Sequence, residues 1–106
     1  MAVEFPKMFR VHQRFDATLP VDVAASVAAG FPVIHGRLKP GMRVAVGVGS
    51  RGISNLAKVV TAVIGELKSA GTEPFIIPAM GSHGGATPEG QAGLLADYGV
   101  TEASMG

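Results

Sequence analysis

Residues 43–48 read Arg-Val-Ala-Val-Gly-Val, and residues 74–79 read Pro-Phe-Ile-Ile-Pro-Ala. Both stretches are short and apolar and lie beside glycine or proline, which is typical of buried strands. Between them the pattern has a helical period, because apolar side chains recur every three or four residues from about Ile53 to the helix stop expected at Gly71. Strands that alternate with helices indicate a parallel sheet. The sequence therefore predicts an α/β fold with a Rossmann-like parallel sheet in βαβα order. The apolar face of the connecting helix should consist of Ile53, Leu56, Val60, Val63, Ile64 and Leu67.

Two further helices and one extended segment are expected around this unit. Residues 88–98 predict a helix that ends near Gly99. Residues 21–30 are rich in alanine and predict a short helix with Pro20 near its start and Gly30 at its end. Residues 3–15 mix apolar and basic side chains without clean alternation, and only a short extended segment is expected there.

The composition indicates a domain whose surface is partly covered. The chain has 106 residues, of which 47% are hydrophobic and only 16% are charged, a low charged fraction for a free-standing domain of this size. Two core strands are too few for a stable doubly wound sheet, and residues 100–106 resemble the approach to another element. We therefore expect residues 1–106 to be a partial N-terminal α/β domain, with its core at 40–106, in a larger two-domain protein. The C-terminal domain or a homo-oligomer would cover the apolar face.

The charge distribution favours a small anionic ligand. Residues 1–60 hold eight basic and three acidic side chains (8 − 3 = +5), whereas residues 61–106 hold one basic and five acidic side chains (1 − 5 = −4). The basic residues are scattered and there is no Trp, so no nucleic acid is expected as a partner. There is no cysteine and no apolar run near the roughly 20 residues of a transmembrane helix. No membrane partner and a cytoplasmic location are therefore expected.

A glycine-rich loop after the first strand is the first candidate site. Gly47, Gly49 and Gly52 form a G-x-G-x-x-G pattern between a strand and a helix, which is the context of a dinucleotide fingerprint. An NAD site also needs an acid at the end of the second strand, and none is present. The missing acid counts against a true dinucleotide site, and the other interpretations are a plain tight turn and an anion or nucleotide site. In the latter, helix N-terminal amides and the guanidinium of Arg51 would hold the anion.

The loop after the second strand holds the best catalytic candidate, His83, between glycines. A histidine can move a proton near neutral pH, although a surface histidine in a flexible turn is the plainer interpretation. Thr87, followed by Pro88, predicts a helix cap. Loops that follow parallel strands open on the same sheet edge, so Arg51 and His83 should face one cleft. A fixed positive charge beside a proton-transfer group suits a carboxylate-bearing substrate. No His or carboxylate pattern completes a metal site, and His12 and His35 lack such a setting.

Two motifs together resemble the N-terminal domain of the nickel-dependent lactate racemase family. They are Gly49-Ser50-Arg51-Gly52-Ile53 and Met80-Gly81-Ser82-His83-Gly84-Gly85-Ala86-Thr87. The resemblance covers residues 40–106 well, and the second motif is its specific part. The lactate racemase itself usually has a His-Arg pair where this chain has His83-Gly84, and an Asp and a Thr around the loop arginine. The chain therefore looks like a divergent branch, and these departures count against lactate as its substrate.

The resemblance implies two α/β domains, a nickel-pincer nucleotide held between them, and racemisation or epimerisation of a small α-hydroxy acid. It implies that His83 is the first of two catalytic histidines and that residues 49–52 bind the cofactor through Gly49, Ser50, Arg51 and Gly52. Arg51, Ser82 and Gly84 are the expected substrate-binding residues. In the family the nickel-binding histidine, the tethering lysine and the second catalytic histidine lie further along, so the 106 residues alone should be inactive. A non-catalytic nucleotide- or anion-binding α/β module and a dinucleotide oxidoreductase are the alternatives.

Overall fold

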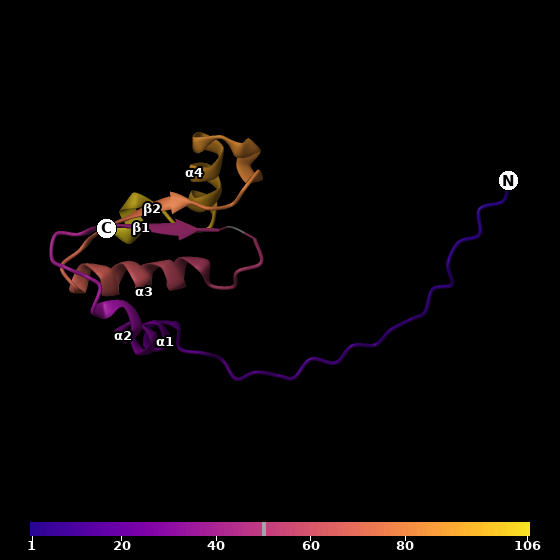
Figure 1. Ribbon diagram of the computed structural model, residues 1–106, viewed down its shortest axis with the longest axis horizontal. Coiled ribbons are helices and arrows are strands. Elements are labelled where there is room, and N and C mark those ends of the chain that lie inside the picture. The colour runs from indigo at the N-terminus through magenta and orange to yellow at the C-terminus, as the bar shows by residue number, and fades with distance from the viewer. Residues whose placement is uncertain (50) are drawn as a thin grey trace.

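The computed structural model describes residues 1–49 and 51–106 and combines helices with a small parallel sheet (Figure 1). The sheet contains β1 (Arg43–Val48) and β2 (Glu73–Pro78), and α3 (Leu56–Ser69) connects them. The other elements are α1 (Val23–Gly30), α2 (Pro32–His35), the short 3-10 turn η1 (His83–Ala86), α4 (Pro88–Asp97) and α5 (Glu102–Met105).

The two strands are adjacent and parallel, which confirms the predicted pairing. Arg43 stands opposite Glu73 and Val48 opposite Pro78. Backbone hydrogen bonds extend the ladder at both ends, from the N–H of Glu73 to the C=O of Met42 and from the N–H of Ala79 to the C=O of Val48, each 2.8 Å long. The second strand begins one residue earlier than predicted. The sheet has two strands, and the Rossmann-like fold remains a prediction.

Helix α3 forms the core by packing its apolar face against one side of the sheet. Its buried residues are Leu56, Val60, Ile64 and Leu67, which recur at helical spacing. Along β1 the side chains alternate, so that Val44 and Val46 are half-buried and Val48 is buried, while the residues between them are exposed. The core also contains Met80 at the end of β2, Leu95 of α4 and Val100. Burial of these apolar side chains is the main favourable contribution to folding.

The prediction that α3 begins near Ile53 is wrong by three residues. Asn55 adopts a left-handed backbone conformation with φ 57°, so the helix cannot extend through it and begins at Leu56. Ile53 therefore lies in the preceding turn and remains 46% exposed. At the other end the prediction is confirmed, because Gly71 follows the helix with φ +79°, a conformation that glycine adopts without steric cost.

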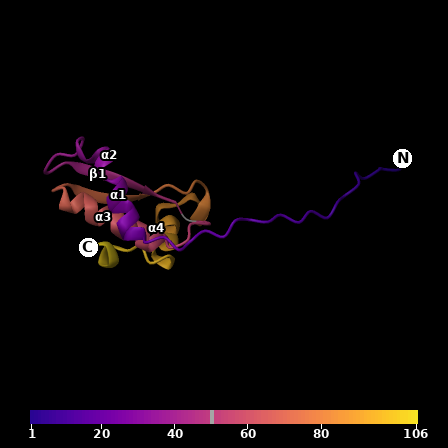
Figure 2. The same ribbon diagram turned by 90° about the horizontal axis from the view of Figure 1, so that it is seen from below.

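Helix α1 begins later than predicted, because Asp22 caps it. The Asp22 carboxylate accepts a hydrogen bond of 3.0 Å from the N–H of Ala25, as an N-cap residue does. Gly30 is the last helical residue, as expected, but the chain does not leave the helix there for a loop. The buried Phe31 leads directly into α2, whose first residue is Pro32. Helix α1 packs on α3 (Figures 1 and 2), so α3 lies between α1 and the sheet.

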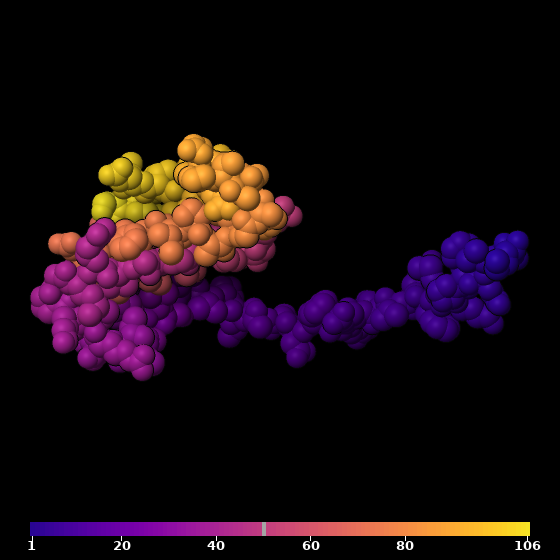
Figure 3. Space-filling view, turned by 45° about the horizontal axis from the view of Figure 1, so that its top comes forward, coloured from indigo at the N-terminus to yellow at the C-terminus, as the bar shows by residue number. Residues whose placement is uncertain are grey.

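Residues 1–21, called the arm below, form neither helix nor strand. The arm leads away from the folded part of the chain, as Figures 2 and 3 show, and gives the structure a longest dimension of 69 Å. The extended segment expected at residues 3–15 thus has an extended course but no strand partner in the described structure.

The second side of the sheet is open and apolar. Phe75 and Ile77 of β2 are 40% and 43% exposed there. On β1 the exposed positions are Arg43 and the small residues Ala45 and Gly47. The guanidinium of Arg43 lies over the ring of Phe75, 5.0 Å from its centroid, which is a cation–π contact. Among the described residues, no helix has the length and apolar character to cross a bilayer.

The role of α3 is tested by replacing Ile64 with alanine. Ile64 is 4% exposed within the core, so the truncation leaves a cavity, and we expect a loss of about 2–5 kcal/mol in unfolding free energy. Lys58→Ala on the exposed side of the same helix is the control and should change stability by less than about 0.5 kcal/mol. The measurement is denaturant unfolding followed by circular dichroism. Equal stabilities of the two variants would contradict this description of the core.

Candidate functional site

Two loops leave the sheet at the same edge and form the candidate site. The first loop, residues 49–55, follows β1, and the second loop, residues 79–87, follows β2. Because the strands are parallel, their carboxyl ends coincide, and Figure 1 shows both loops leaving the arrowheads. The loops also approach each other at their origins. A side-chain carbon placed on Gly49 would lie 3.7 Å from the Ala79 carbonyl oxygen, and one on Gly47 would lie 3.5 Å from the Ala79 side chain.

The first loop presents a charged side chain next to a left-handed glycine. Arg51 is exposed. Gly52 has φ +72°, a conformation that glycine adopts without steric cost, which explains why a glycine stands there. Gly49 is half-buried. Ser50, the remaining predicted cofactor-binding residue, lies outside the described residues. The anion or nucleotide site and the plain tight turn both remain predictions.

The second loop has a backbone that few residue types can adopt. Gly84 and Gly85 have φ values of 63° and 69°, and Ala86 follows with φ 57°, so three consecutive residues are left-handed. Gly81 is left-handed as well, with φ +60°. Glycines tolerate this conformation, whereas Ala86 adopts it at a steric cost. Such strain persists only where the surrounding structure holds it in place.

Helix α4 is the element that holds the second loop. A side-chain carbon on Gly90 would lie 1.9 Å from the Gly84 carbonyl oxygen, so the two backbones are in direct contact and neither residue has room for a side chain. The Gln91 side-chain amide donates hydrogen bonds to the carbonyls of Gly81 (2.8 Å) and His83 (3.2 Å). Thr87 caps the helix as predicted, because its hydroxyl accepts from the N–H of Gly90 at 3.1 Å.

These contacts identify Gln91 and Gly90 as site residues that sequence reasoning missed. The sequence contains one signal for this role of Gln91, which is its position four residues after the Thr87 cap. A side chain in the first helical turn can reach back to the preceding loop. The contacts also give Gly84 a packing role. Its predicted contact with substrate remains a prediction, as does that of the exposed Ser82.

His83 lies at the first position of η1, directly after the turn that begins at the buried Met80. Its N–H donates to the Met80 carbonyl at 3.2 Å, and its own carbonyl accepts from Gln91. The backbone on which the imidazole stands is therefore fixed on both sides, and the residue is half-buried. A half-buried imidazole on a fixed backbone is suited to proton transfer. The arrangement favours a defined position for His83 over a flexible surface turn.

The structure places both loops at one edge, and the cleft expected between Arg51 and His83 remains a prediction. Two hollows in the surface involve other residues. One, of about 640 Å³, lies among α1, α3 and α5, and another, of about 620 Å³, runs beside β2 and α4. Neither is lined by Arg51 or His83.

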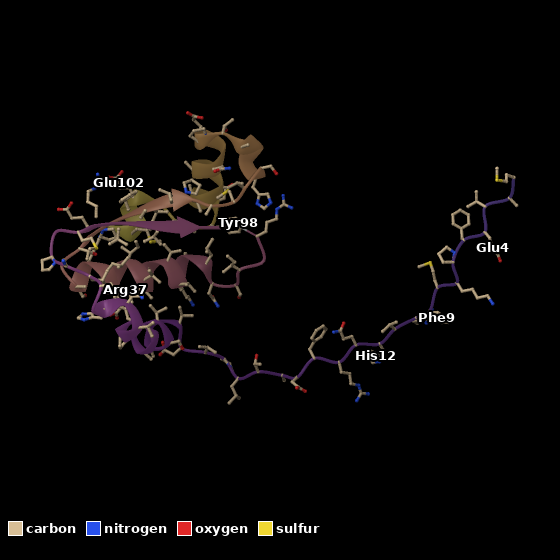
Figure 4. The ribbon with its side chains drawn as sticks, viewed as in Figure 1. Glu4, Phe9, His12, Arg37, Tyr98 and Glu102 are labelled. Carbon is tan, nitrogen blue, oxygen red and sulfur yellow. The ribbon has the colours of Figure 1, made fainter. Side chains whose placement is uncertain are left out.

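The other histidines lie elsewhere. His12 is on the arm, far from the folded body (Figure 4), and His35 ends α2. Within residues 1–49 and 51–106, no three His, Cys, Asp or Glu side chains are placed together to hold a metal ion.

No protein-family model, curated protein or solved structure matches this chain.

The contact between Gly84 and Gly90 is tested by alanine substitution within α4. Gly90→Ala should displace the second loop and destabilise the protein by about 1–3 kcal/mol, because the new methyl group overlaps the Gly84 carbonyl. Gly93→Ala, in the same helix, is the matched control. It has open space around it and should stabilise the protein by about 0.5–1 kcal/mol, since alanine is the better helix former. Thermal unfolding and the NMR shifts of the His83 imidazole are the measurements. Unchanged His83 shifts in Gly90→Ala would contradict the proposed support.

Proposed function

We propose that this chain is the N-terminal, Rossmann-like part of an enzyme that racemises or epimerises a small α-hydroxy acid with a nickel-pincer nucleotide. The observation that carries the proposal is the placement of His83, on a backbone fixed by Gln91 and Met80, at the same sheet edge as Arg51. The alternative of a non-catalytic anion-binding module uses the first loop alone and leaves the strained second loop without a role.

The described residues suit the anionic end of a nucleotide. Arg51 offers a planar guanidinium in solvent. Asn55 gives no side-chain hydrogen bond to the start of α3, and the N–H groups of a first helical turn are a common binding site for anions. By contrast, we propose none of the described residues as a nickel ligand. When bound, the cofactor supplies an acceptor for the substrate hydride.

His83 is the residue proposed to move the substrate hydroxyl proton. Its imidazole accepts that proton as the hydroxyl becomes a carbonyl and returns it when the carbonyl is reduced. Arg51 would hold the substrate carboxylate or the cofactor phosphate through two parallel N–H donors. The Ser82 hydroxyl and the Gly84 N–H would orient the remaining substrate oxygens.

The same proposal also implies the partners and the location of the protein. The partner is a small hydroxy acid, with no role for nucleic acid or membrane, and the location is cytoplasmic. A C-terminal domain would close the site and cover the open sheet face around Phe75 and Ile77.

The catalytic role is tested by His83→Ala in the cofactor-loaded enzyme produced from the complete gene. We expect kcat to fall by about 10²–10⁴-fold, because the proton transfer loses its acid/base, while bound nickel stays unchanged. His35→Ala is the control, since His35 ends α2, outside both loops, and should leave kcat unchanged. The measurement is interconversion of hydroxy-acid enantiomers or epimers, with nickel quantified in each variant. Wild-type kcat in His83→Ala would reject the proposal.

The anion-binding role is tested by Arg51→Ala and Arg51→Lys. Alanine should raise KM or lower cofactor loading more than it lowers kcat, and lysine should restore binding only in part, because an ammonium group cannot make the planar two-pronged contact. Arg37→Ala, on an exposed residue outside the two loops, is the matched control and should behave as wild type (Figure 4). If nucleotide binding depends on Arg51 but no hydroxy acid is converted, the non-catalytic module is the correct function.

A further inference from the structure

The arm is strongly apolar, and none of the other described residues covers it. Among the described residues, 1–21 make no hydrogen bond. Large apolar side chains of the arm are between 68% and 122% exposed. They are Met1, Val3, Phe5, Met8, Phe9, Val11, Phe15, Leu19 and Val21. Apolar surface on this scale marks a site of association.

Residues 9–15 of the arm carry the pattern of a half-buried strand. Phe9, Val11 and Phe15 alternate with Arg10, His12 and Arg14, and Gln13 is the single polar exception on the apolar side. Over the longer window of residues 3–15 the alternation is not clean, because residues 6–8, Pro-Lys-Met, interrupt it. In an extended chain, Phe9 and Val11 therefore lie on one face and Arg10 and His12 on the other.

The two edges of the sheet differ in their capacity to accept another strand. In β2 the N–H groups of Glu73 and Ala79 point toward β1, so the backbone nitrogens of Pro74, Ile76 and Pro78 point outward by the alternation of a strand. Two of these three nitrogens belong to proline and carry no hydrogen, which blocks pairing at that edge. The outer edge of β1 has no such block, because Arg43, Ala45 and Gly47 direct complete N–H and C=O pairs outward.

We propose that residues 9–15 of the arm add as a strand to the outer edge of β1 in a second copy of this chain, and that two copies exchange arms reciprocally. The arm is rooted at α1, which α3 separates from the sheet, and it runs away from its own domain (Figures 1 and 3). The arm thus carries a strand pattern without a partner strand, and the β1 edge of another copy offers unpaired backbone groups that it can bind. Reciprocal exchange satisfies both parts in a closed, symmetric dimer. This inference does not depend on the proposed enzymatic function.

The exchange predicts how residues 9–15 sit on the sheet. Their backbone N–H and C=O groups would pair with those of Arg43, Ala45 and Gly47. The small side chains of Ala45 and Gly47 leave space for a neighbouring aromatic ring, such as that of Phe9, on the open face. Phe75 and Ile77 would then continue one apolar surface across three strands.

The first test compares two adjacent arm positions on opposite faces of the strand, Val11→Lys and His12→Lys. Both variants add the same charged side chain, and neither can unfold the domain, because the arm makes no hydrogen bond to it and its apolar side chains are exposed. Size-exclusion chromatography with light scattering should give twice the chain mass of 10.8 kDa for the wild type and for His12→Lys. Val11→Lys should raise the dissociation constant by roughly 100-fold, since each dimer loses two buried valines. A monomeric wild type, or equal behaviour of the two variants, overturns the proposal.

The second test locates the receiving edge. Ala45→Pro removes one outward N–H from β1 and should abolish the dimer, whereas β1–β2 pairing, followed by circular dichroism, should persist because Ala45 does not donate to β2. Cross-linking identifies which copy supplies the arm, since the chain has no native cysteine. Differently tagged Ala45→Cys and Val11→Cys chains, whose cysteines would lie on the same face of the extended sheet, are mixed and treated with a short bismaleimide, and a chain that carries both cysteines is treated separately. A cross-link between the two tags supports exchange. A cross-link found only within a chain carrying both cysteines, or a dimer that survives in a folded Ala45→Pro variant, overturns it.

Discussion

The packing of one face of α3 against the parallel pair β1–β2 is the interaction on which the other features depend. Parallel strands cannot be joined by a tight turn, so the chain must cross over, and here the crossover is the helix that also fills the core. Val48, Leu56 and Met80 belong to this core and lie at or beside the origins of the two loops. The burial that stabilises the domain therefore also positions Arg51 and His83 at one sheet edge.

The second loop shows how a strained conformation is maintained in so small a domain. A left-handed alanine costs of order 1–3 kcal/mol, and Ala86 follows two left-handed glycines. The contacts that offset this cost come from α4, through Gly90 and Gln91. Left-handed non-glycine residues occur in both loops, Ala86 after His83 and Asn55 after Arg51, while the strands and α3 remain regular. Such residues cluster at functional sites, which supports the proposed roles of His83 and Arg51.

The sequence predicted the elements whose signals are local and repetitive. The β-branched run at 43–48, the apolar spacing of α3 and the Thr87 cap each indicate one structure by themselves. The start of α3 was misplaced because Ile53 fits the helical spacing, while the left-handed Asn55 that excludes it leaves no periodic signal. The contact between Gly84 and Gly90 was not predictable for a related reason. It depends on the path of a whole loop, and a glycine in a helix has many explanations. An apolar face in need of a cover was expected from the low charged fraction, but no motif indicates that it is the second side of the sheet.

The backbone contact between the second loop and α4 has a mechanical consequence. The loop contacts the backbone of α4 without any intervening side chain, and the Gln91 amide of the same helix donates two hydrogen bonds to it. The loop therefore cannot open as a flap that moves independently of α4. The contacts at Gly90 and Gln91 join the loop to α4, and Leu95, about one helical turn further along that helix, is buried in the core. A displacement of His83 would therefore also disturb the packing of α4 in the interior of the domain.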